Sequence, residues 1–170
     1  MKFRELTTDE KALLLRDIAA RIPFEPKCKF NLQYAGNGEE EGIYDADIDS
    51  VEPYGSCEVT YGPYLREWHP MIEDVRPYLR PMTSMTEEEV DEIRKRLNSR
   101  GNVGRAITKN NFQKMNDLVW FCNMRDYECV GNSMMGDVID YLNEKMFDWR
   151  GLIPKDLAIE VTEENNPYNK

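Results

Sequence analysis

The sequence contains one histidine, His69, and its four cysteines form no Cys-x-x-Cys pair. A structural zinc site needs closely spaced ligand pairs and usually histidines, so this composition argues against zinc. The cysteines are expected to stay reduced, because no segment indicates export to an oxidising compartment. None of them lies in a nucleophile motif, so the sequence does not favour catalysis by a thiol with His69 as its base. The four are Cys28, Cys57, Cys122 and Cys129.

Long apolar runs are also absent from the sequence. No stretch approaches the roughly 18 apolar residues that a membrane-spanning helix requires. The first residues, Met1–Glu5, lead into a charged helix instead of the apolar core of a signal peptide. From the sequence we expect a soluble, cytoplasmic protein that makes no membrane contact.

The hydrophobic content and the length of the chain suffice for one folded domain. Hydrophobic residues make up 41% and charged residues 32% of the 170 positions. This apolar content can offset the entropy that is lost when the chain is ordered, and the length suits one domain. We therefore expect a single domain over residues 1–170, with a loose tail at 162–170.

Residues 1–66 are predicted to form a helix and a small antiparallel sheet. Leu14 and Ile18 belong to an apolar series at helical spacing over residues 8–22, and Thr7 with Glu10 fits a capping box. Apolar and polar residues then alternate, which predicts strands at about 28–34, 43–51 and 57–61. The turns between these strands indicate an antiparallel meander or a barrel-like arrangement.

Residues 67–85 contain Pro70, Pro77 and Pro81, which predicts a proline-braced connection without a long helix. The following part, 86–161, is predicted to be mainly helical. A helix, then strands, then helices is the order typical of an α+β fold. The helices are expected at about 86–97, 110–125 and 135–146, and residues 157–161 form a short strand or lie on the core.

Charge is segregated along the chain, whose net charge is −10. Residues 94–114 carry seven basic side chains and no acid, whereas residues 39–52 carry seven acidic side chains and no base. Opposite fields of this kind can bind each other or two different partners, and the sequence leaves both open. Helix electrostatics explains Arg94, Lys95 and Arg96, which end a helix with an acidic first turn. It does not explain Arg100 and Arg105, which lie around a glycine turn.

Three aspartates, Asp45, Asp47 and Asp49, occupy every second position of a predicted strand. In an extended strand they project from one face about 7 Å apart. They resemble the opening of a calcium loop, but Ser50 and Ser56 stand where that loop needs glycine and a bidentate glutamate. The solvated side of a strand is the simpler interpretation, and a divalent cation is the alternative.

The glycine turn Gly101–Arg105 could present backbone amides and guanidinium groups to a phosphate. It lacks the Gly-Lys-Ser/Thr ending of a nucleotide-binding P-loop. No aromatic residue lies between Arg94 and Lys109 to stack on a base, and a net acidic protein repels nucleic acid overall. The turn is therefore interpreted first as a connection between two helices.

Two stretches, Val75–Glu89 and Tyr141–Asn143 with the following Phe147–Ile153, show a resemblance to known proteins. They are similar to a set of small uncharacterised proteins of gut Bacteroides-type bacteria and their phages or prophages. The resemblance covers the first helix, the proline-braced segment and the C-terminal part, and it does not include the basic segment. It implies a cytoplasmic setting and a phage or mobile-element origin, but no activity and no catalytic residue.

We interpret the chain as an accessory protein that binds another macromolecule, because its charge is organised and its catalytic chemistry is not. The expected partner is a protein. One alternative is a nucleic-acid or nucleotide-processing accessory that uses the basic turn and a divalent cation on Asp45, Asp47 and Asp49, and another is a purely structural subunit. No other cofactor is expected, and enzymatic activity and oligomeric state stay open. The predicted binding residues are Arg94, Arg96, Arg100 and Arg105.

Overall fold

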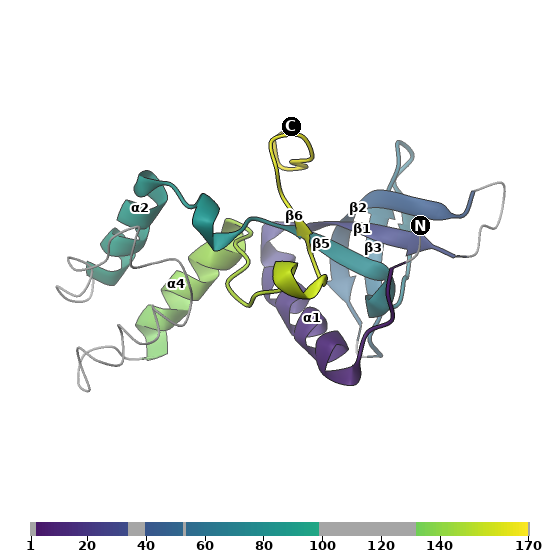
Figure 1. Cartoon of the computed structure of the whole chain (residues 1–170), viewed down its shortest axis with the longest axis horizontal. Helices are drawn as coiled ribbons and strands as arrows, with labels where there is room; N and C mark the ends of the chain where they lie inside the picture. Colours follow the sequence, from purple (N-terminus) through teal and green to yellow (C-terminus); the bar gives the residue numbers. More distant parts are fainter. Residues whose placement is uncertain (1–2, 34–39, 53, 99–131, 170) are drawn as a thin grey trace. The chain divides into compact units, whose positions relative to one another are not determined.

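The computed structural model describes residues 3–33, 40–52, 54–98 and 132–169 (Figure 1). The chain divides into two compact units, which are described separately. Unit 1 comprises residues 1–79 and 151–170, and unit 2 comprises residues 80–150. A division by contacts does not decide the number of domains, so the single domain stays a prediction.

Unit 1 consists of an N-terminal helix and an open sheet, and the predicted α+β class is confirmed. The helix is α1, Thr8–Arg21, followed by the 3-10 turn η1, Ile22–Phe24. The strand order among the described residues is β4-β3-β2-β1-β5-β6, and the sheet does not close into a barrel. The strands are β1 Lys27–Leu32, β2 Gly42–Val51, β3 Cys57–Tyr61, β4 Arg66–Trp68, β5 Val75–Leu79 and β6 Ile159–Glu160.

The start of α1 carries the capping box that the sequence predicts. The backbone N–H of Glu10 donates to Thr7 Oγ1 at 3.3 Å, and the Glu10 carboxylate accepts from the Thr7 N–H at 2.9 Å. Arg4 lies 2.7 Å from the same carboxylate, and its hydrogen bond lowers the pKa of Glu10 to about 2. Local sequence therefore fixes where this helix begins.

The helix buries Leu14 and Ile18 together with a buried ion pair, in which Arg21 Nε lies 2.7 Å from Asp17 Oδ2. Both side chains of the pair are fully buried. The spacing of four residues places them on one side of the helix. α1 therefore presents a mixed surface to the sheet, and Figure 1 shows it lying along that sheet.

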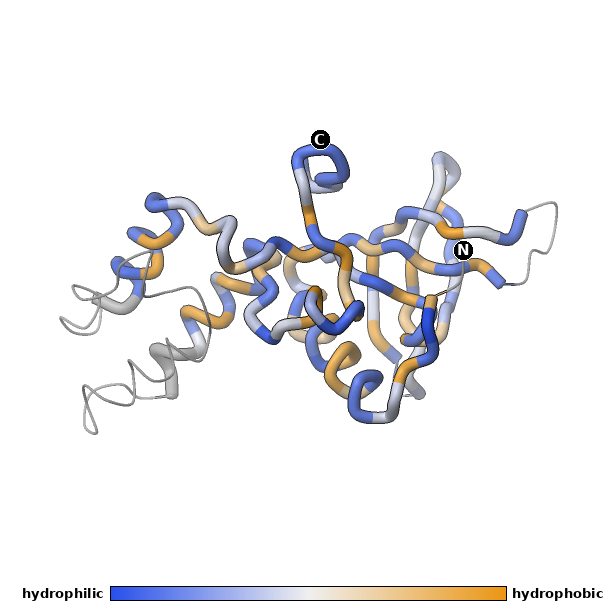
Figure 2. The backbone as a smooth tube through the Cα atoms, in the orientation of Figure 1, coloured by the Kyte–Doolittle hydropathy of each residue, from blue (hydrophilic) through white to orange (hydrophobic). Residues whose placement is uncertain are grey.

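The register of the sheet separates an apolar face from a polar one. Cys28 pairs with Ala46, and Ile48 with Val59, and all four are buried. Their neighbours along each strand point to the other side, because side chains alternate across a strand. Figure 2 shows hydrophobic and hydrophilic positions alternating along these strands.

Strand β5 corrects the interpretation of residues 67–85 as a connection. The segment contains no α-helix before Glu87, as expected, but its five residues Val75–Leu79 form a fully buried strand beside β1. Pro77 lies in the middle of this strand. Because proline has no N–H for the ladder, its presence in a run disguises a strand in the sequence.

Strand β6 pairs with β5 in parallel, so the sheet is mixed and not entirely antiparallel. It follows the 3-10 turn η6, Ile153–Lys155, and it confirms the short strand expected near residue 159. Beyond it, the Thr162 N–H donates to Asn165 Oδ1 at 2.7 Å. The Tyr168 hydroxyl then accepts from the Lys27 N–H and donates to the Tyr78 carbonyl, each at 3.1 Å.

Unit 2 is built from two α-helices, α2 Glu87–Asn98 and α4 Asn132–Glu144, and the 3-10 turn η3, Met82–Ser84, among its described residues. Both match predicted helices, whereas the predicted helix at 110–125 lies outside the described residues. Thr86 and Glu89 cap α2, with the Thr86 N–H donating to Glu89 at 2.8 Å. The core of the unit includes Val90, Ile93, Val138, Leu142 and Phe147.

Arg80 joins the start of unit 2 to the residues after α4. Its backbone bonds Met146 and Asp148 at 2.8 Å each, and its guanidinium lies 4.3 Å from the centre of the Phe147 ring. The same guanidinium reaches the Glu89 carboxylate at 2.7 Å. Burial, the largest single influence, raises the pKa of Glu89, but the hydrogen bonds from Arg80 and from the Thr86 N–H, together with the charges of Arg80 and Lys145, lower it overall.

No helix in the described part of the chain is long and apolar enough to cross a membrane.

Candidate functional site

Five carboxylates lie on the polar side of the sheet, which we call the acidic face. Cross-strand pairing places Asp47 beside Thr60 and Thr60 beside Glu67, so β2, β3 and β4 all contribute to it. The described basic residues of this side in β1 are Lys27 and Lys29. Arg76 of β5 is buried, where it donates to the carbonyl of Asp156 at 3.0 Å. The acidic face consists of Asp45, Asp47, Asp49, Glu58 and Glu67.

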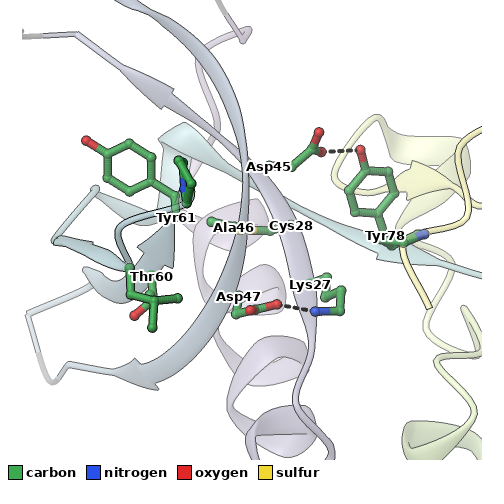
Figure 3. A pocket seen from close by; sticks show the side chains of 12 residues that line it. Lys27, Cys28, Asp45, Ala46, Asp47, Thr60, Tyr61 and Tyr78 are labelled. Atoms are coloured by element: carbon green, nitrogen blue, oxygen red, sulfur yellow. Dashed lines mark hydrogen bonds and ion pairs between the residues drawn. The ribbon is translucent and has the colours of Figure 1, made fainter. Parts of the chain in front are cut away.

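Each aspartate of the acidic face has its own contact within the protein. Asp45 accepts from the Tyr78 hydroxyl at 2.6 Å, and Asp47 pairs with Lys27 (Figure 3). Asp49 accepts from Thr60 Oγ1 at 2.6 Å. All three remain exposed to solvent. These contacts orient the three aspartates of the acidic face, and the aspartates remain exposed to solvent.

The predicted metal residues are Asp45, Asp47 and Asp49. They do share one side of β2, as the alternation predicts, although the register shifts between Ile48 and Ser50 and makes Asp49 the extra residue of a bulge. No group of three acidic, cysteine or histidine side chains that could hold a metal ion occurs among the described residues. The structure thus brings the aspartates onto one face without assembling them as a ligand set.

A hollow of about 430 Å³ lies at the acidic face. Asp45 and Asp47 line it, together with Tyr78 and the turn between β3 and β4. Burial and the hydrogen bond to Asp45 raise the pKa of Tyr78, so its hydroxyl stays a donor. Pro167, from the C-terminal turn, forms part of the wall. We call this space the acidic hollow.

A second hollow, of about 460 Å³, has three tyrosines among its seven lining residues. Tyr44 and Tyr61 belong to an aromatic cluster in which their ring centres lie 5.5 Å apart. The Tyr44 hydroxyl donates to the Glu40 carbonyl at 2.7 Å, which fixes its orientation. Tyr64 is 81% exposed. We call this space the tyrosine hollow, and it is lined by Glu40, Tyr44, Tyr61, Gly62, Pro63, Tyr64 and Arg66.

The predicted binding arginines fall into two groups. Arg94 forms an ion pair with Asp91 of its own helix, and Arg96 lies 3.5 Å from Glu144 of α4 and 4.6 Å from the Tyr141 ring centre. Their charge is therefore matched within unit 2. The other two, Arg100 and Arg105, lie outside the described residues, so the glycine turn between them stays a prediction.

The only histidine of the chain belongs to a small network at the β2–β3 turn. The Ser56 hydroxyl donates to the Glu52 carboxylate, and His69 Nδ1 lies 3.1 Å from the same carboxylate. The hydrogen bond from Ser56 lowers the pKa of Glu52. In a Ser-His-Asp triad the serine hydroxyl is hydrogen-bonded to the histidine. Here the carboxylate lies between them, so the network braces the turn.

The sequence did not indicate this network, because Glu52 and Ser56 belong to a turn and His69 follows a separate strand. The buried thiols are likewise not placed for catalysis. Cys28 and Cys57 are both fully buried, and burial raises the pKa of each thiol, to about 12 for Cys57. A thiol with so high a pKa is rarely a thiolate at neutral pH. Cys122 and Cys129 lie outside the described residues.

Comparison with known proteins gives no relative: no protein-family model, no curated protein and no solved structure matches the chain.

Proposed function

We propose that this chain is an accessory protein that acts by binding a basic segment of another protein on the acidic face. The observation that supports the proposal is the excess of charge on one regular surface. Five carboxylates from β2, β3 and β4 stand against two lysines from β1. A patch of one sign on a rigid sheet attracts and orients a partner of the opposite sign.

A single ion pair on the surface is too weak to hold a partner, so binding needs all the carboxylates of the acidic face. An exposed ion pair contributes only about 0.2–1 kcal/mol, and it is screened by salt over about 10 Å. Several carboxylates on adjacent strands lie within that distance of one another, since neighbouring strands are about 4.8 Å apart. A basic segment therefore meets their summed field, and its binding should weaken as the salt concentration rises.

The proposal shifts the predicted binding site from the basic residues to the acidic ones. Arg94 and Arg96 are matched by acids of unit 2, whereas the acidic face has fewer basic side chains than carboxylates. The resemblance to proteins of gut bacteria and their phages suggests a phage or prophage origin and a cytoplasmic partner. Both remain proposals about the setting of the same binding activity.

The experiment is affinity capture from a lysate of the native host with matched variants. The test variant combines Asp47→Asn, Asp49→Asn and Glu67→Gln. The control variant combines Glu5→Gln, Glu163→Gln and Glu164→Gln, which removes the same charge from exposed positions outside the acidic face. Proteins captured by the wild type and the control but lost with the test variant support the proposal. Identical sets of proteins on all three would overturn it.

A further inference from the structure

The sheet of unit 1 ends at β6 on one side and at β4 on the other, among the described residues. At β6 the carbonyl of Glu160 accepts a hydrogen bond from Asn165 Nδ2 at 3.0 Å, so the chain's own turn takes up a backbone group of that border. β4 pairs with β3 on its inner side, and no strand of the described part of the chain pairs with its outer side. A border strand points every second N–H and C=O away from the sheet, so an extended chain can add to it. We call the outer side of β4 the open edge.

The acidic face reaches the open edge at Glu67. Register aligns Glu67 with Thr60 of β3, and Thr60 with Asp47 of β2, so a row of polar side chains crosses three strands and ends at β4. Glu67 is exposed, and it has no hydrogen-bond or ion-pair partner among the described residues, whereas Asp47 pairs with Lys27. A strand added to the open edge places a side chain directly opposite Glu67. Opposite charges stabilise such a cross-strand pair, so this carboxylate favours a basic residue.

The other side of β4 sets a different requirement. Arg66 and Trp68 flank Glu67 in the strand, so their side chains point to the apolar side of the sheet. The register agrees, because Trp68 pairs with the buried Val59. A basic residue opposite Arg66 meets a like charge, whereas a β-branched residue packs well beside the ring of Trp68. A strand that adds here should therefore carry basic residues at every second position, with uncharged β-branched residues between them.

A second copy of this chain fits the open edge poorly. An antiparallel pair of β4 strands that includes all three residues of each is centred on Glu67, and it sets the two Glu67 carboxylates directly opposite each other. Like charges in that position are destabilising. A short border strand that carries a charge is a common means of preventing such pairing between copies. The charge of Glu67 thus disfavours the chain itself and favours a basic strand.

We propose that the open edge of β4 binds an extended basic segment as an added strand. Basic residues at every second position of the segment lie on the side of Glu67 and the acidic face, and β-branched residues between them lie beside Trp68. The backbone of the segment forms hydrogen bonds with the outward N–H and C=O groups of β4. This inference rests on the proposed function and deepens it, because it gives the conformation and the residue pattern of the basic partner.

Fluorescence anisotropy with labelled peptides tests the residue pattern. The probe is four repeats of Thr-Arg. The comparison peptide is Thr-Thr-Thr-Thr-Arg-Arg-Arg-Arg, which has the same composition and charge without the alternation. A strand formed by the comparison peptide directs only half of its arginines to the acidic face and the other half to the side of Arg66. We therefore expect the probe to bind at least about fivefold more tightly.

Methylation of the peptide backbone tests the addition of a strand. The N–H groups of alternate residues point to opposite edges of a strand, so one edge of the probe carries the N–H groups of the threonines and the other carries those of the arginines. Two further probes are N-methylated at two central threonines or at two central arginines. An added strand bonds β4 through one edge only. One methylated probe should therefore bind at least about tenfold more weakly, and the other should stay within about twofold of the unmodified probe.

A charge reversal and peptide contacts locate the site. Glu67→Lys should weaken binding of the unmodified probe at least about tenfold. Glu163→Lys is the matched control, because it makes the same change of charge at an exposed position outside the acidic face. Nuclear Overhauser contacts between the backbone of the bound probe and residues 66–68 identify the open edge. Thermal unfolding of each variant verifies that the fold is retained.

The outcomes separate the inference from the proposed function. Weakening by one methylation only, together with contacts to residues 66–68, supports the inference. Equal affinity of all four peptides, or equal weakening by both methylations, would overturn the open edge and leave the acidic face supported as a surface that adds no strand. Failure of every peptide to bind would also overturn the open edge, and the capture experiment would then decide the proposed function independently. Signals of residues 66–68 that shift with the concentration of the free chain would assign the edge to a second copy and likewise overturn the inference.

Discussion

Tyr168 shows how one residue near the end of the chain ties distant segments together. Its hydroxyl contacts the backbone of Lys27 in β1 and of Tyr78 in β5, at 3.1 Å each. Burial raises its pKa to about 12, so the hydroxyl keeps its proton at neutral pH. Both contacts join Tyr168 to residues that are far away in the sequence, so they leave no local sequence pattern. For this reason the sequence predicts a loose tail at residues 162–170.

Replacing Tyr168 by phenylalanine tests this tie. The change keeps the ring and removes two hydrogen bonds, each worth about 0.5–1.5 kcal/mol. We expect the free energy of unfolding to fall by about 1–3 kcal/mol. Urea unfolding measures the change, with Tyr54→Phe as the control at an exposed position. Equal stability of Tyr168→Phe and the wild type would contradict the role given to the hydroxyl.

The contribution of Glu10 to the stability of the fold is predicted to depend on pH. Its ordinary pKa of 4.5 is lowered to about 2 in the folded protein by Arg4 and Thr7. A carboxylate with a lowered pKa stabilises the fold above its ordinary pKa and loses that contribution as pH falls towards the lowered value. Glu10→Gln should therefore lower the melting temperature at pH 6, and the difference should shrink between pH 4.5 and pH 2.

Thermal melting of the wild type and Glu10→Gln across this pH range measures the effect. Glu5→Gln serves as the comparison, because Glu5 is exposed in the same segment. A difference for Glu10→Gln that stays constant down to pH 2 would show that the loss is not electrostatic.

For these residues, the sequence predicts only the contacts between near neighbours in the chain. Thr7 and Glu10 are three positions apart, so their capping box is visible in the sequence. Arg4 also donates to the carbonyl of Lys155 at 2.6 Å, across 151 positions. Contacts of that separation depend on how the strands pair, and no periodicity of the sequence encodes them.

At the scale of elements, α1 carries an ion pair inside its buried surface. Asp17 and Arg21 are both fully buried, and the side chains meet at 2.7 Å. Removing one member of such a pair leaves a buried charge, which costs about 3–5 kcal/mol. We expect Asp17→Asn to destabilise unit 1 by that amount in a chemical denaturation experiment.

A second variant distinguishes charge burial from packing. The pair Asp17→Leu with Arg21→Met removes both charges and keeps similar volume, so it should cost less than Asp17→Asn alone. If the double variant is the less stable of the two, then the ion pair contributes net stability and this explanation is wrong.

The sequence predicts elements well where their period is uninterrupted. The apolar spacing of residues 8–22 gives α1, and the alternation of residues 57–61 gives β3. It misses β5, because Pro77 hides a strand that is buried throughout. It also cannot place β6 beside β5, since a parallel pairing across about half of the chain leaves no local signal.

At the scale of the molecule, the acidic stretch 39–52 is visible in the sequence, but the acidic face is not. Glu58 and Glu67 join the aspartates only through the pairing of β2 with β3 and of β3 with β4. The alternation of Asp45, Asp47 and Asp49 predicts that they share a side of one strand. Glu58 and Glu67 extend this side because of the sheet register. The sequence does not predict that register.

The acidic face is the proposed binding site for a basic protein segment. NMR spectra of the ¹⁵N-labelled chain, titrated with four repeats of Gly-Ser-Arg, test it most directly. We predict shifts concentrated in residues 45–49, 58–60 and 67, weakened by added salt and absent with a Gly-Ser-Glu peptide. Shifts confined to other residues, or equal shifts with both peptides, would contradict the claim.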